Sequence, residues 1–521
     1  MDAMELLFPV LLTLGLLVVA GTAYVYNRFS QKDFGLPSSA LPPVEGETEI
    51  DRRALPLLKA QDGMTGATLI SDNVDAFAAR AISARQAGRS LDLQYYYWRR
   101  DLTGYLLAQE VIAAADRGVR VRLLLDDINA GLHDALCIAL DAHPNIEVRL
   151  FNPSRARTDK LRRALEMMLR PLRATRRMHN KAWIADGRLV IAGGRNIGDA
   201  YFDAAEQANF RDLDMWMIGP AAEQASTIFD DYWNSRMVLP IGSLRTPRRH
   251  FLPRLRRKLA RIARKADARH YLAHVTRAEQ TAALFHGEGT LRFTRDVTFK
   301  SDPPEKAFME RRQNWLMRAL MPTITGAKDG LRIISPYFIP GEEGVAQLTA
   351  LTERGVDVSV LTNSLAATDV AAVHGAYRNY RKALLRAGVT LFELKAVHEP
   401  TESQRISLFG SRGASLHTKA FTIDRQTGFV GSMNFDPRSA SLNTEMGVLF
   451  SHPELVADVD AVFDMEAGPA GSFRVALDSG SLVWHEAGDD AARVLTREPE
   501  AGFWRRVTAR IIGVLPIESQ L

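Results

Sequence analysis

The feature that most constrains the fold of this 521-residue chain is a stretch of sequence that occurs twice. RRMHNKAWIADGRLVIAGGRN covers residues 176–196, and SLHTKAFTIDRQTGFVGSMN covers residues 415–434. In each copy a lysine follows a histidine by two positions, an aspartate by seven, a glycine by 14 and an asparagine by 17. Identical spacing over such a length indicates an internal duplication, because chance similarity does not keep its register.

The segments upstream of the two copies repeat as well, in the order strand, helix, strand. The matched strand segments are SLDLQYYYW and RGVRVRLLLDD in the first half, and GLRIISPYFI and RGVDVSVLTNS in the second. Gly118 lies 61 residues before His179, and Gly355 lies 62 residues before His417. Strands that alternate with helices predict βαβ units and a parallel or mixed sheet covered on both faces. We therefore predict two similar α/β domains in tandem.

The N-terminus predicts a membrane anchor. Residues 6–26 form an uncharged run of 21 residues, long enough to cross a bilayer core as one helix. A cleaved signal peptide is the main alternative, but the segment before the run holds Asp2 and Glu5 and no lysine or arginine. Basic residues follow the run, which favours a cytoplasmic position for the rest of the chain only weakly. We predict a single-pass anchor over residues 1–32 and leave the side of the membrane open.

Composition divides the remainder of the chain. Proline, glycine and acidic residues between the anchor and the first repeat predict a linker. The predicted units are a linker at 33–56, a first domain at 57–242, a basic amphipathic connecting segment at 243–310, a second domain at 311–470 and a C-terminal extension at 471–521. Cys137 is the only cysteine, which excludes an intrachain disulfide and a structural zinc site with two or more cysteines.

Two stretches are strongly basic. Residues 243–270 hold 11 Lys/Arg against one Asp, and residues 154–177 hold nine Lys/Arg. In the first stretch an apolar stripe at helical spacing consists of Leu252, Leu255, Leu259 and Ile262. Such a stretch is either a solvated face or a basic amphipathic surface that rests on anionic lipid headgroups, and we favour the lipid surface because of the predicted anchor. The same charges also suit nucleic acid.

Each copy of the repeat supplies groups that phosphodiester chemistry requires. On a strand, His179 and Lys181 would point to the same face. Glycines at 193 and 194 let backbone amides approach a ligand closely, and Asn196 adds a side-chain donor. Two copies together offer imidazoles, ammonium groups and amides for a nucleophile, an acid and the anionic oxygens. These residue types leave other anionic esters open as substrates.

Both copies match the H-x-K-x4-D pattern of the phospholipase D superfamily, and GGRN and GSMN match its following G-[GS]-x-N. The chain resembles most closely the bacterial cardiolipin synthases, in particular their C type, over nearly everything after the linker. The stretches that carry this resemblance are MHNKAWIADGRLVIAGGRNIGDAYFD, FRDLDMWMIGP, ATDVAAVHGAYRNYRKALLRAGVTLFEL, GSMNFDPRSASLNTEMGVL and LPIESQL. It implies two tandem phospholipase D-like domains, each a mixed sheet flanked by helices, that pack as a pseudo-two-fold dimer after the N-terminal transmembrane helix.

The resemblance implies phosphatidyl transfer from a donor phospholipid to phosphatidylglycerol through a covalent phosphohistidine. It favours His179 as the nucleophile and His417 as the acid and base, and the symmetry of the copies leaves the reverse assignment open. Lys181 and Lys419 would hold the non-bridging oxygens. The groups expected to support the phosphate are Asn196, Asn434, Gly194 and Ser432, and the motif aspartates expected to be structural are Asp186 and Asp424.

A carboxylate on the second ring nitrogen fixes the tautomer of a catalytic histidine. Glu445, in NTE, fits this role in the second half. The first half has DLD at the equivalent place, where we expect Asp214 to be the partner and Asp212 to be the second candidate.

No metal or other cofactor is expected, because lysines and histidines cover the charge and proton work, and no nucleotide is needed for an exchange of one phosphodiester for another. The expected partners are phosphatidylglycerol, with phosphatidylethanolamine as an alternative donor, and an anionic membrane surface, here the bacterial inner membrane. One chain carries both copies, so a monomer suffices. A phospholipase D-type hydrolase that releases phosphatidic acid, a nuclease of the same superfamily and a non-catalytic scaffold are the alternatives, and the anchor argues against nucleic acid.

Overall fold

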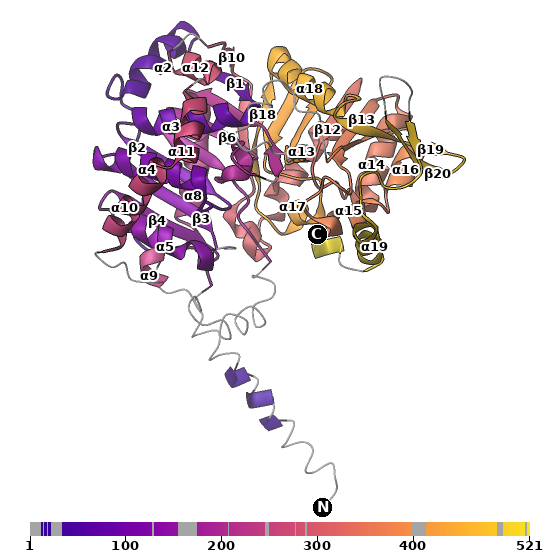
Figure 1. Cartoon of the computed structure of the whole chain (residues 1–521), viewed down its shortest axis with the longest axis horizontal. Coiled ribbons are helices and arrows are strands. Elements are labelled where there is room, and N and C mark those ends of the chain that lie inside the picture. Colours follow the sequence, from indigo (N-terminus) through magenta and orange to yellow (C-terminus); the bar gives the residue numbers. More distant parts are fainter. Residues whose placement is uncertain are drawn as a thin grey trace, which may run out of the picture.

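The structure is a computed structural model. It describes residues 12–13, 15–17, 19–21, 34–127, 130–154, 175–206, 208–244, 250–276, 278–286, 289–396, 413–486, 493–515 and 518–520. The first half of the chain (indigo to magenta in Figure 1) forms one α/β domain, and the second half (orange to yellow) forms another beside it.

The first domain is built on a nine-stranded sheet with the order β10-β1-β8-β6-β5-β2-β3-β4-β9. Its strands are β1 (Thr65–Ile70), β2 (Ser90–Tyr95), β3 (Arg120–Asp126), β4 (Ile146–Phe151), β5 (Ala182–Ala185), β6 (Leu189–Gly193), β8 (Asp214–Ile218), β9 (Val238–Pro240) and β10 (Arg292–Thr294). β2, β3 and β4 pair in parallel, whereas β5 pairs with β2 in the antiparallel direction. The sheet is therefore mixed, as predicted.

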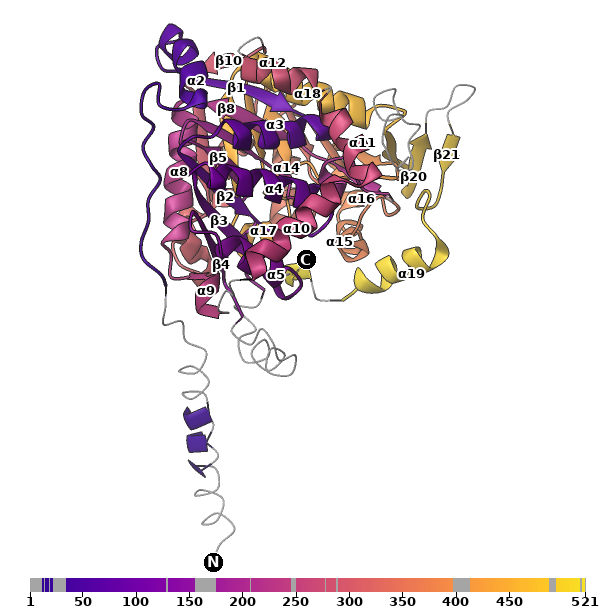
Figure 2. The ribbon, with the colours of Figure 1, turned by 60° about the vertical axis from the view of Figure 1, so that its left-hand side comes forward.

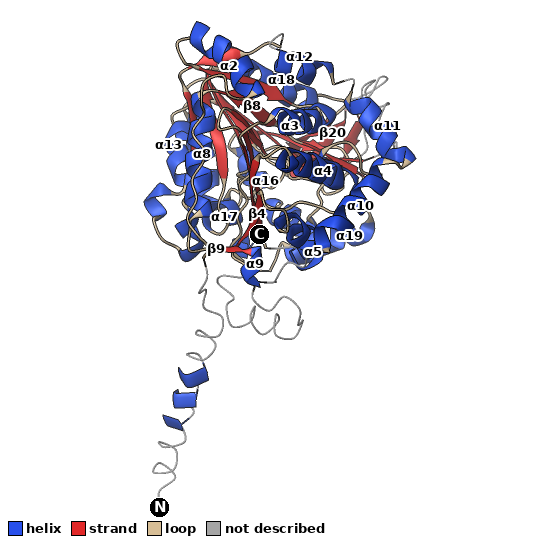
Figure 3. Ribbon diagram, turned by 90° about the vertical axis from the view of Figure 1, so that its left-hand side faces the viewer, coloured by secondary structure: helices blue, strands red, loops and turns tan. Residues whose placement is uncertain are grey.

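Helices cover both faces of this sheet, which is why its central strands read as continuous apolar runs. Trp183 and Ile191 pack on the side of α3 and α4, whereas Ile184 and Val190 pack on the side of α8. Figure 3 shows these helices on opposite sides of the strands. The helices of the domain are α2 (Glu49–Ala60), α3 (Asn73–Gln86), α4 (Leu102–Asp116), α5 (Ala130–Asp141), α8 (Pro220–Trp233), α9 (Ile241–Leu244), α10 (Phe251–Ala263), α11 (Ala266–Val275) and α12 (Glu279–His286).

The second domain is built on a ten-stranded sheet with the order β11-β18-β17-β16-β12-β13-β14-β19-β20-β21. Its strands are β11 (Val297–Ser301), β12 (Gly330–Ile334), β13 (Asp357–Asn363), β14 (Thr390–Leu394), β16 (Ala420–Ile423), β17 (Thr427–Gly431), β18 (Met446–Ser451), β19 (Ser472–Asp478), β20 (Ser481–Glu486) and β21 (Arg493–Leu495). Its helices are α13 (Leu316–Thr325), α14 (Gly341–Glu353), α15 (Ala371–Tyr377), α16 (Arg381–Arg386), α17 (Pro437–Ser441), α18 (Pro453–Ala467) and α19 (Phe503–Ile512).

The two sheets match strand for strand from β1 to β9 and from β11 to β19. The run β1-β8-β6-β5-β2-β3-β4-β9 corresponds to β11-β18-β17-β16-β12-β13-β14-β19. Each copy of the repeated stretch supplies the hairpin β5–β6 or β16–β17 near the middle of its sheet. The duplication predicted from the sequence is thus confirmed as a duplicated topology.

The two domains share one hydrophobic core. Val190 and Met217 of the first sheet belong to the same buried cluster as Val430 and Val448 of the second. A separate two-stranded parallel sheet, made of β7 (Ala208–Arg211) and β15 (Gly413–Leu416), also joins one domain to the other. The junction is therefore packed like a domain interior, and side chains placed there have fixed positions.

The structure differs from the predicted domain boundaries in three places. Helix α2 begins at Glu49, inside the predicted linker, and is capped by Thr48 and Asp51. β10 and β11, both in the predicted connecting segment, pair with β1 and β18, so each completes a sheet. β19 pairs with β14, so the predicted C-terminal extension adds strands to the second sheet. Composition could not show these contacts, because short edge strands carry little pattern.

Helix α10 contains the predicted apolar stripe but buries it. Leu255 and Leu259 are buried, and Leu252 and Ile262 pack against the core of the first domain. What the helix leaves on the surface is its basic side, and Arg256 there pairs with Asp116 at 2.6 Å. The stripe is therefore a packing face. Only the charged side of this helix is available for contact with a membrane. Most of the second basic stretch, residues 155–174, lies outside the described residues.

Within the described part of the chain, no helix is long and apolar enough to cross a membrane. Most of the predicted anchor, residues 1–11, 14, 18 and 22–32, lies outside the described residues. The anchor thus remains a prediction from the sequence.

Candidate active site

The two repeated motifs meet at the junction between the domains. His179 and Lys181 lie in an extended segment just before β5, and His417 and Lys419 lie just before β16. The backbone N–H of His179 donates to the carbonyl of Thr444, and that of His417 donates to the carbonyl of Arg211, both at 2.8 Å. Each motif is therefore attached to the opposite domain.

His179 is oriented by a carboxylate from the second domain. Its Nδ1 lies 2.8 Å from Oε2 of Glu445 and 3.1 Å from the carbonyl oxygen of Ser432. Both oxygens only accept hydrogen bonds, so the proton belongs on Nδ1 and the lone pair on Nε2. No described residue makes a hydrogen bond to Nε2 of His179. Burial lowers the pKa of this imidazole, and the charge of Glu445 opposes that shift.

Glu445 is itself held in place. It is fully buried, and it accepts hydrogen bonds from the hydroxyls of Ser432 and Ser439, the latter at 2.9 Å. Burial acts to raise the pKa of its carboxyl, but His179 and Lys181 act more strongly and the pKa is lowered. The carboxylate therefore stays ionised as the partner of His179.

His417 is oriented by a carboxylate from the first domain. Its Nδ1 lies 2.5 Å from Oδ2 of Asp212 and 2.9 Å from Nζ of Lys419. Its Nε2 lies 3.4 Å from the hydroxyl of Tyr201. Burial lowers the pKa of His417 well below its ordinary value, and the charges of Lys419 and Lys181 lower it further. Burial therefore favours the neutral form of this imidazole.

The expectation that Asp214 would orient a histidine is wrong, and Asp212 has this position. Strand register explains why: β6 pairs Gly193 with Asp214, and β17 pairs the equivalent Gly431 with Gly447. Asp214 thus corresponds to Gly447, and Asp212, two residues earlier, corresponds to Glu445. Alignment by the letters DLD and NTE shifts the first half by two residues.

Asp214 instead belongs to a buried ion cluster in the first domain. Its Oδ2 lies 2.9 Å from a guanidinium nitrogen of Arg80 and 3.3 Å from one of Arg195, and all three side chains are buried. Its role is to neutralise the positive charges of these two buried arginines.

The motif lysines are buried beside the histidines. Nζ of Lys181 donates to the carbonyl of His179 at 2.7 Å, and Nζ of Lys419 donates to the carbonyl of His417. Burial lowers the pKa of Lys181 to about 7 and that of Lys419 to about 8. An anionic phosphodiester would favour the charged form of both, since opposite charges stabilise each other most where water is excluded.

The motif aspartates hold turns, as the resemblance implied. Asp186 and Asp424 both have left-handed backbone conformations, with φ of 55° and 53°. The carboxylate of Asp186 accepts from backbone N–H groups including that of Ser90, and that of Asp424 accepts from N–H groups including that of Gly330. Each ties the β-turn of its hairpin to the start of the adjacent strand, β2 or β12, and neither contacts a motif histidine or lysine.

The predicted phosphate-supporting residues lie close to the histidines. The amide of Asn196 donates to the hydroxyl of Tyr201 at 3.1 Å, which links it to His417. Oδ1 of Asn434 is buried and makes no hydrogen bond with any described residue. Gly194 is required because a Cβ there would lie 2.1 Å from Oδ1 of Asp212. Ser432 acts through Glu445 and His179, as described above.

Comparison with known proteins assigns the family. The model of the family described as cardiolipin synthase, phospholipase D-like domain, matches residues 82–233 and 320–466. Cardiolipin synthase C of Escherichia coli K12 is 40% identical over 475 residues, which are 89% of this chain and 98% of that protein. The chain belongs to the cardiolipin synthase family with phospholipase D-like domains.

More distant relatives agree with this family. A cardiolipin synthase of Geobacillus sp. WCH70 is 26% identical over 399 residues, which are 76% of this chain and 65% of that protein. The crystal structure of a phosphatidylserine synthase of Haemophilus influenzae superposes with a TM-score of 0.57 at 13% identity, over 91% of this chain and 100% of the other. That likeness shows the fold alone. The matched segments of this cardiolipin synthase family member contain both motifs, Asp212 and Glu445.

Two hydroxyl contacts at the site were not predicted, and an aromatic contact comes from Tyr96. The Tyr96 ring lies edge-on to His179 with centroids 5.0 Å apart, although its neighbours Tyr95 and Trp98 are core residues. Tyr201 contacts His417, and Ser439 contacts Glu445. Hydroxyl groups of this kind give no sequence signal, because tyrosine and serine are common and their partners come from distant segments.

Two residues at strand ends could have been found from the repeat. Oδ2 of Asp126 at the end of β3 accepts from the N–H of Met178 at 2.8 Å. Asn363 at the end of β13 exchanges two hydrogen bonds with the backbone of Leu416, at 2.9 and 3.0 Å. Each thus fixes the residue that precedes a motif histidine, and the matched strands LLLDD and VLTNS place them at equivalent positions.

A cluster of one histidine and two glutamates has the spacing of a metal site, but an arginine occupies it. His374, Glu393 and Glu498 bring their ligand atoms close together, and Arg381 pairs with both carboxylates, with Glu393 at 2.9 Å. The guanidinium supplies the positive charge that a cation would bring. We assign this cluster to holding Glu498 of the C-terminal segment on α16.

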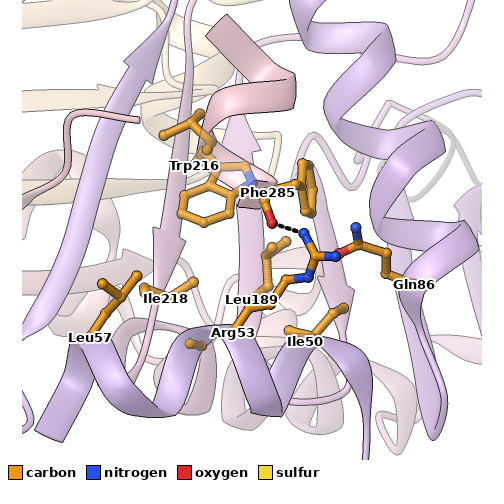
Figure 4. A pocket seen from close by; sticks show the side chains of 10 residues that line it. Ile50, Arg53, Leu57, Gln86, Leu189, Trp216, Ile218 and Phe285 are labelled. Carbon is orange, nitrogen blue, oxygen red and sulfur yellow. Dashed lines mark hydrogen bonds between the residues drawn. The ribbon is translucent and has the colours of Figure 1, made fainter. Parts of the chain in front are cut away.

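A small cavity in the first domain is separate from the motifs. It lies between α2, β6, β8 and α12, and Figure 4 shows Trp216, Phe285, Leu189 and Ile50 around it. Its volume of about 20 Å³ has room for one water molecule. Nε1 of Trp216 and Oε1 of Gln86 line it without a hydrogen-bond partner among the described residues. The cavity is therefore far too small to bind a lipid.

Proposed function

We propose that this chain makes cardiolipin by transferring a phosphatidyl group from a donor phospholipid to the free glycerol hydroxyl of phosphatidylglycerol. Family membership supports the reaction class. The observation that carries the proposal is the crossed pairing of the site: Glu445 orients His179, Asp212 orients His417, and each pair joins the two domains. Two imidazoles, each with a carboxylate at Nδ1, and two lysines form the set that a two-step phosphoryl exchange requires.

In the first step, Nε2 of His179 attacks phosphorus and the bond from phosphorus to the headgroup oxygen breaks. His417, charged once the anionic donor is bound, gives its Nε2 proton to that oxygen, and the headgroup leaves as a neutral alcohol. Glu445 balances the charge that develops on His179, while Lys181 and Lys419 neutralise the non-bridging oxygens. The product of this step is a phosphatidyl group bound to Nε2 of His179.

In the second step, the glycerol hydroxyl of phosphatidylglycerol attacks the same phosphorus. His417 accepts the hydroxyl proton, the phosphorus–nitrogen bond breaks, and cardiolipin leaves. Over the two steps one phosphorus–oxygen ester bond breaks and another of the same kind forms, so no activated donor is required. Water that reaches the phosphohistidine would give phosphatidic acid instead.

Contacts at the two Nε2 atoms support the assignment of His179 as the nucleophile. Nε2 of His417 already has a hydroxyl oxygen beside it, that of Tyr201, in the kind of position that a leaving or entering alcohol would take. Nε2 of His179 has no such partner among the described residues and is open to phosphorus. The symmetric alternative exchanges these two roles.

Trapping the phosphohistidine tests both the covalent mechanism and the roles of His179 and His417. Full-length enzyme in vesicles would be mixed with a phosphorus-labelled phosphatidyl donor whose headgroup leaves without an acid, quenched at alkaline pH, where phosphohistidine is stable, and tested for label on the protein. We expect label on the His417→Gln variant and none on His179→Gln. Label on His179→Gln alone would reverse the roles, and label on neither, with cardiolipin still produced by the wild type, would contradict a covalent mechanism.

Product analysis separates transfer from hydrolysis and identifies the donor. Headgroup-labelled phosphatidylglycerol and phosphatidylethanolamine would be supplied separately and together. Free glycerol or free ethanolamine released with cardiolipin names the donor. Phosphatidic acid as the main product would make the enzyme a hydrolase.

We further propose that one polypeptide is sufficient, because the domains form the site as a pseudo-two-fold pair. The membrane anchor predicted at residues 1–32 is part of this proposal, and it places the enzyme in the bacterial inner membrane. Described side chains of this segment, including Leu16 and Leu17, are exposed and apolar. Alkaline extraction of membranes tests the anchor: the full chain should stay in the membrane fraction, and release would contradict a spanning segment.

A further inference from the structure

The C-terminal helix α19 exposes large apolar side chains. Phe503, Trp504 and Val514 are 64%, 77% and 80% exposed, and Ile511 and Leu515 are exposed as well. We call these five residues the α19 surface. Single exposed apolar residues are common, but five on one helix and its end form a patch of the kind that marks a binding surface. Figure 2 shows α19 at the periphery of the molecule.

Helix α19 packs on the protein through its small residues. Ala509 is fully buried, and a Cβ on Gly375 of α15 would lie 2.6 Å from its carbonyl oxygen. A Cβ on Gly513 would lie 2.6 Å from the carbonyl of Gly375, and Asn379 donates to the carbonyl of Gly513 at 3.0 Å. A helix on the surface of a water-soluble protein buries its large apolar side chains and exposes its polar ones. Here the large apolar side chains face outward.

Every charged residue within α19 and its end is an arginine. Residues 503–515 contain three arginines and no acidic residue. Arg505 donates to the carbonyl of Thr368, which fixes the start of the helix on the second domain. Arg510 is exposed, and Arg506 is partly exposed. Aromatic and aliphatic side chains beside arginines are the composition of a helix that lies in the interface of an anionic bilayer.

The α19 surface lies next to elements that form the site. The loop before α15 carries Asp369, whose carboxylate accepts from Tyr337 at 2.8 Å and whose charge acts on both His417 and Lys419. Beyond α19, the carbonyl of Gln520 accepts from Arg438 of α17 at 3.1 Å. That helix also carries Ser439, which holds Glu445. The C-terminal segment therefore reaches from the side of one histidine to the side of the other.

The predicted anchor joins the folded body at the same end of the molecule. Phe34 follows it, and the carbonyl of Phe34 accepts from Arg149 of β4 at 3.3 Å, close to Pro240 of β9. Figure 1 shows β4 and α9 at the lower end of the first domain and α19 at the lower end of the second. One flat membrane could thus contact both.

We propose that the α19 surface inserts into the headgroup region of an anionic bilayer and holds the active site against the membrane. The geometry of α19 carries the docking itself, and the consequence for lipid supply rests on the proposed function. A second copy of the chain fits this surface less well, because two copies would bring two sets of arginines together with no acidic residue between them.

The first experiment asks whether position 504 enters lipid. Full-length Trp504→Cys, labelled with an environment-sensitive fluorophore, would be reconstituted in vesicles of phosphatidylglycerol and phosphatidylethanolamine with and without brominated acyl chains. The matched control is Val494→Cys on β21, which is exposed on the same C-terminal segment but lies outside α19. Cys137 is buried, and labelling of the parent chain measures its background.

We expect brominated lipid to quench the label at position 504 and not at position 494. Equal emission with and without bromine at both positions would overturn the proposal. A spectral shift at position 504 that follows protein concentration in detergent without lipid would assign the surface to a second copy and also overturn it. Because the full chain keeps its anchor, the measurement reports contact of α19 and not membrane binding as such.

The second experiment measures lipid supply. Trp504→Ser combined with Phe503→Ser should raise KM for phosphatidylglycerol in vesicles and leave kcat/KM for a short-chain soluble analogue unchanged. Arg510→Gln should weaken the contact with anionic vesicles by about fivefold, the effect of one surface charge. An unchanged KM in vesicles would contradict the docking role. If the wild type produced no cardiolipin from either substrate, the proposed function would fail while the quenching result stood.

Discussion

The two halves of the active site have the same arrangement of motifs and differ in the groups that contact each histidine. On the His179 side, Glu445 is held by two serine hydroxyls and Nε2 is open. On the His417 side, Asp212 and Lys419 both approach Nδ1, and Tyr201 lies at Nε2. A carboxylate at Nδ1 with an open Nε2 suits a nucleophile, whereas a hydroxyl oxygen beside Nε2 marks a position that suits an acid and base. This difference supports the proposal that equivalent residues of the duplicated domains have different roles, with His179 as the nucleophile and His417 as the acid and base.

The largest expected effect comes from removing each histidine. His179→Gln and His417→Gln should each lower kcat by about 10⁴-fold or more, because the two groups act in the same steps. The comparison is sharpened by a donor whose headgroup is a good leaving group and needs no acid: only His417→Gln should still release that headgroup. Identical behaviour of the two variants with such a donor would remove the distinction between the sides.

The next largest loss of kcat is expected from changing the carboxylates that orient the histidines. Glu445→Gln and Asp212→Asn should each lower kcat by about 10²–10⁴-fold, because an amide permits the wrong tautomer. Glu445→Gln should mainly slow formation of the phosphohistidine, and Asp212→Asn should slow both proton transfers. Single-turnover kinetics with labelled donor separates these steps.

Asp214→Asn tests whether Asp212 alone has the orienting role. This change leaves Arg80 and Arg195 buried without their carboxylate and should lower the free energy of unfolding by about 3–5 kcal/mol. At a temperature where the variant remains folded, its kcat should be close to that of the wild type. A loss of kcat as large as that of Asp212→Asn, in a fully folded Asp214→Asn sample, would restore Asp214 as the orienting residue.

The lowered pKa values of Lys181 and Lys419 predict opposite effects of rising pH on kcat/KM and on the free energy of unfolding. Their pKa values of about 7 and 8 are below the ordinary value of 10.5, so raising the pH from 7 to 9 removes charge that binds phosphate and should lower kcat/KM. The unfolded chain keeps these protons up to about pH 10.4, so the same rise in pH favours the folded state.

Lys181→Met tests the pH effect against the wild type. It should remove the lower of the two alkaline steps in kcat/KM and reduce the increase of unfolding free energy between pH 7 and 9. Denaturant unfolding and kinetics over this range provide both values. A pH profile identical to that of the wild type would show that Lys181 keeps its proton.

The smallest expected effects are at the hydroxyl groups. Ser439→Ala removes one hydrogen bond to Glu445, and Tyr201→Phe removes the hydroxyl beside His417. A single hydrogen bond to a charged group is worth about 1.5–3 kcal/mol, so Ser439→Ala should lower kcat by about 10–100-fold at most. Tyr201→Phe should have less effect and should change the ratio of transfer to hydrolysis. Product ratios and kcat for the two variants provide this comparison.

Helices α10 and α19 show a second difference that the sequence alone could not resolve. Both have basic and apolar residues at helical spacing, and the sequence favoured the segment of α10 as the lipid surface. In the structure α10 buries Leu255 and Leu259 in the first domain, whereas α19 exposes Trp504 and Phe503. Amphipathic pattern shows that a helix has an apolar face, but not what that face contacts.

Local order along the chain was sufficient for the duplication, the alternation of strands and helices, and the two motifs. These depend on spacing and on short-range periodicity, which the sequence shows directly. The same information predicted that a carboxylate would orient each histidine, and it identified Glu445.

The tertiary structure decided which groups meet across the domains. It pairs His179 with Glu445 and His417 with Asp212, and it places Asp214 with two arginines, because strand register determines which side chains reach the junction. It also brings the C-terminal segment beside α15 and α17. Such contacts join residues that are far apart in the sequence, so no local pattern records them and only the packing of the two sheets determines them.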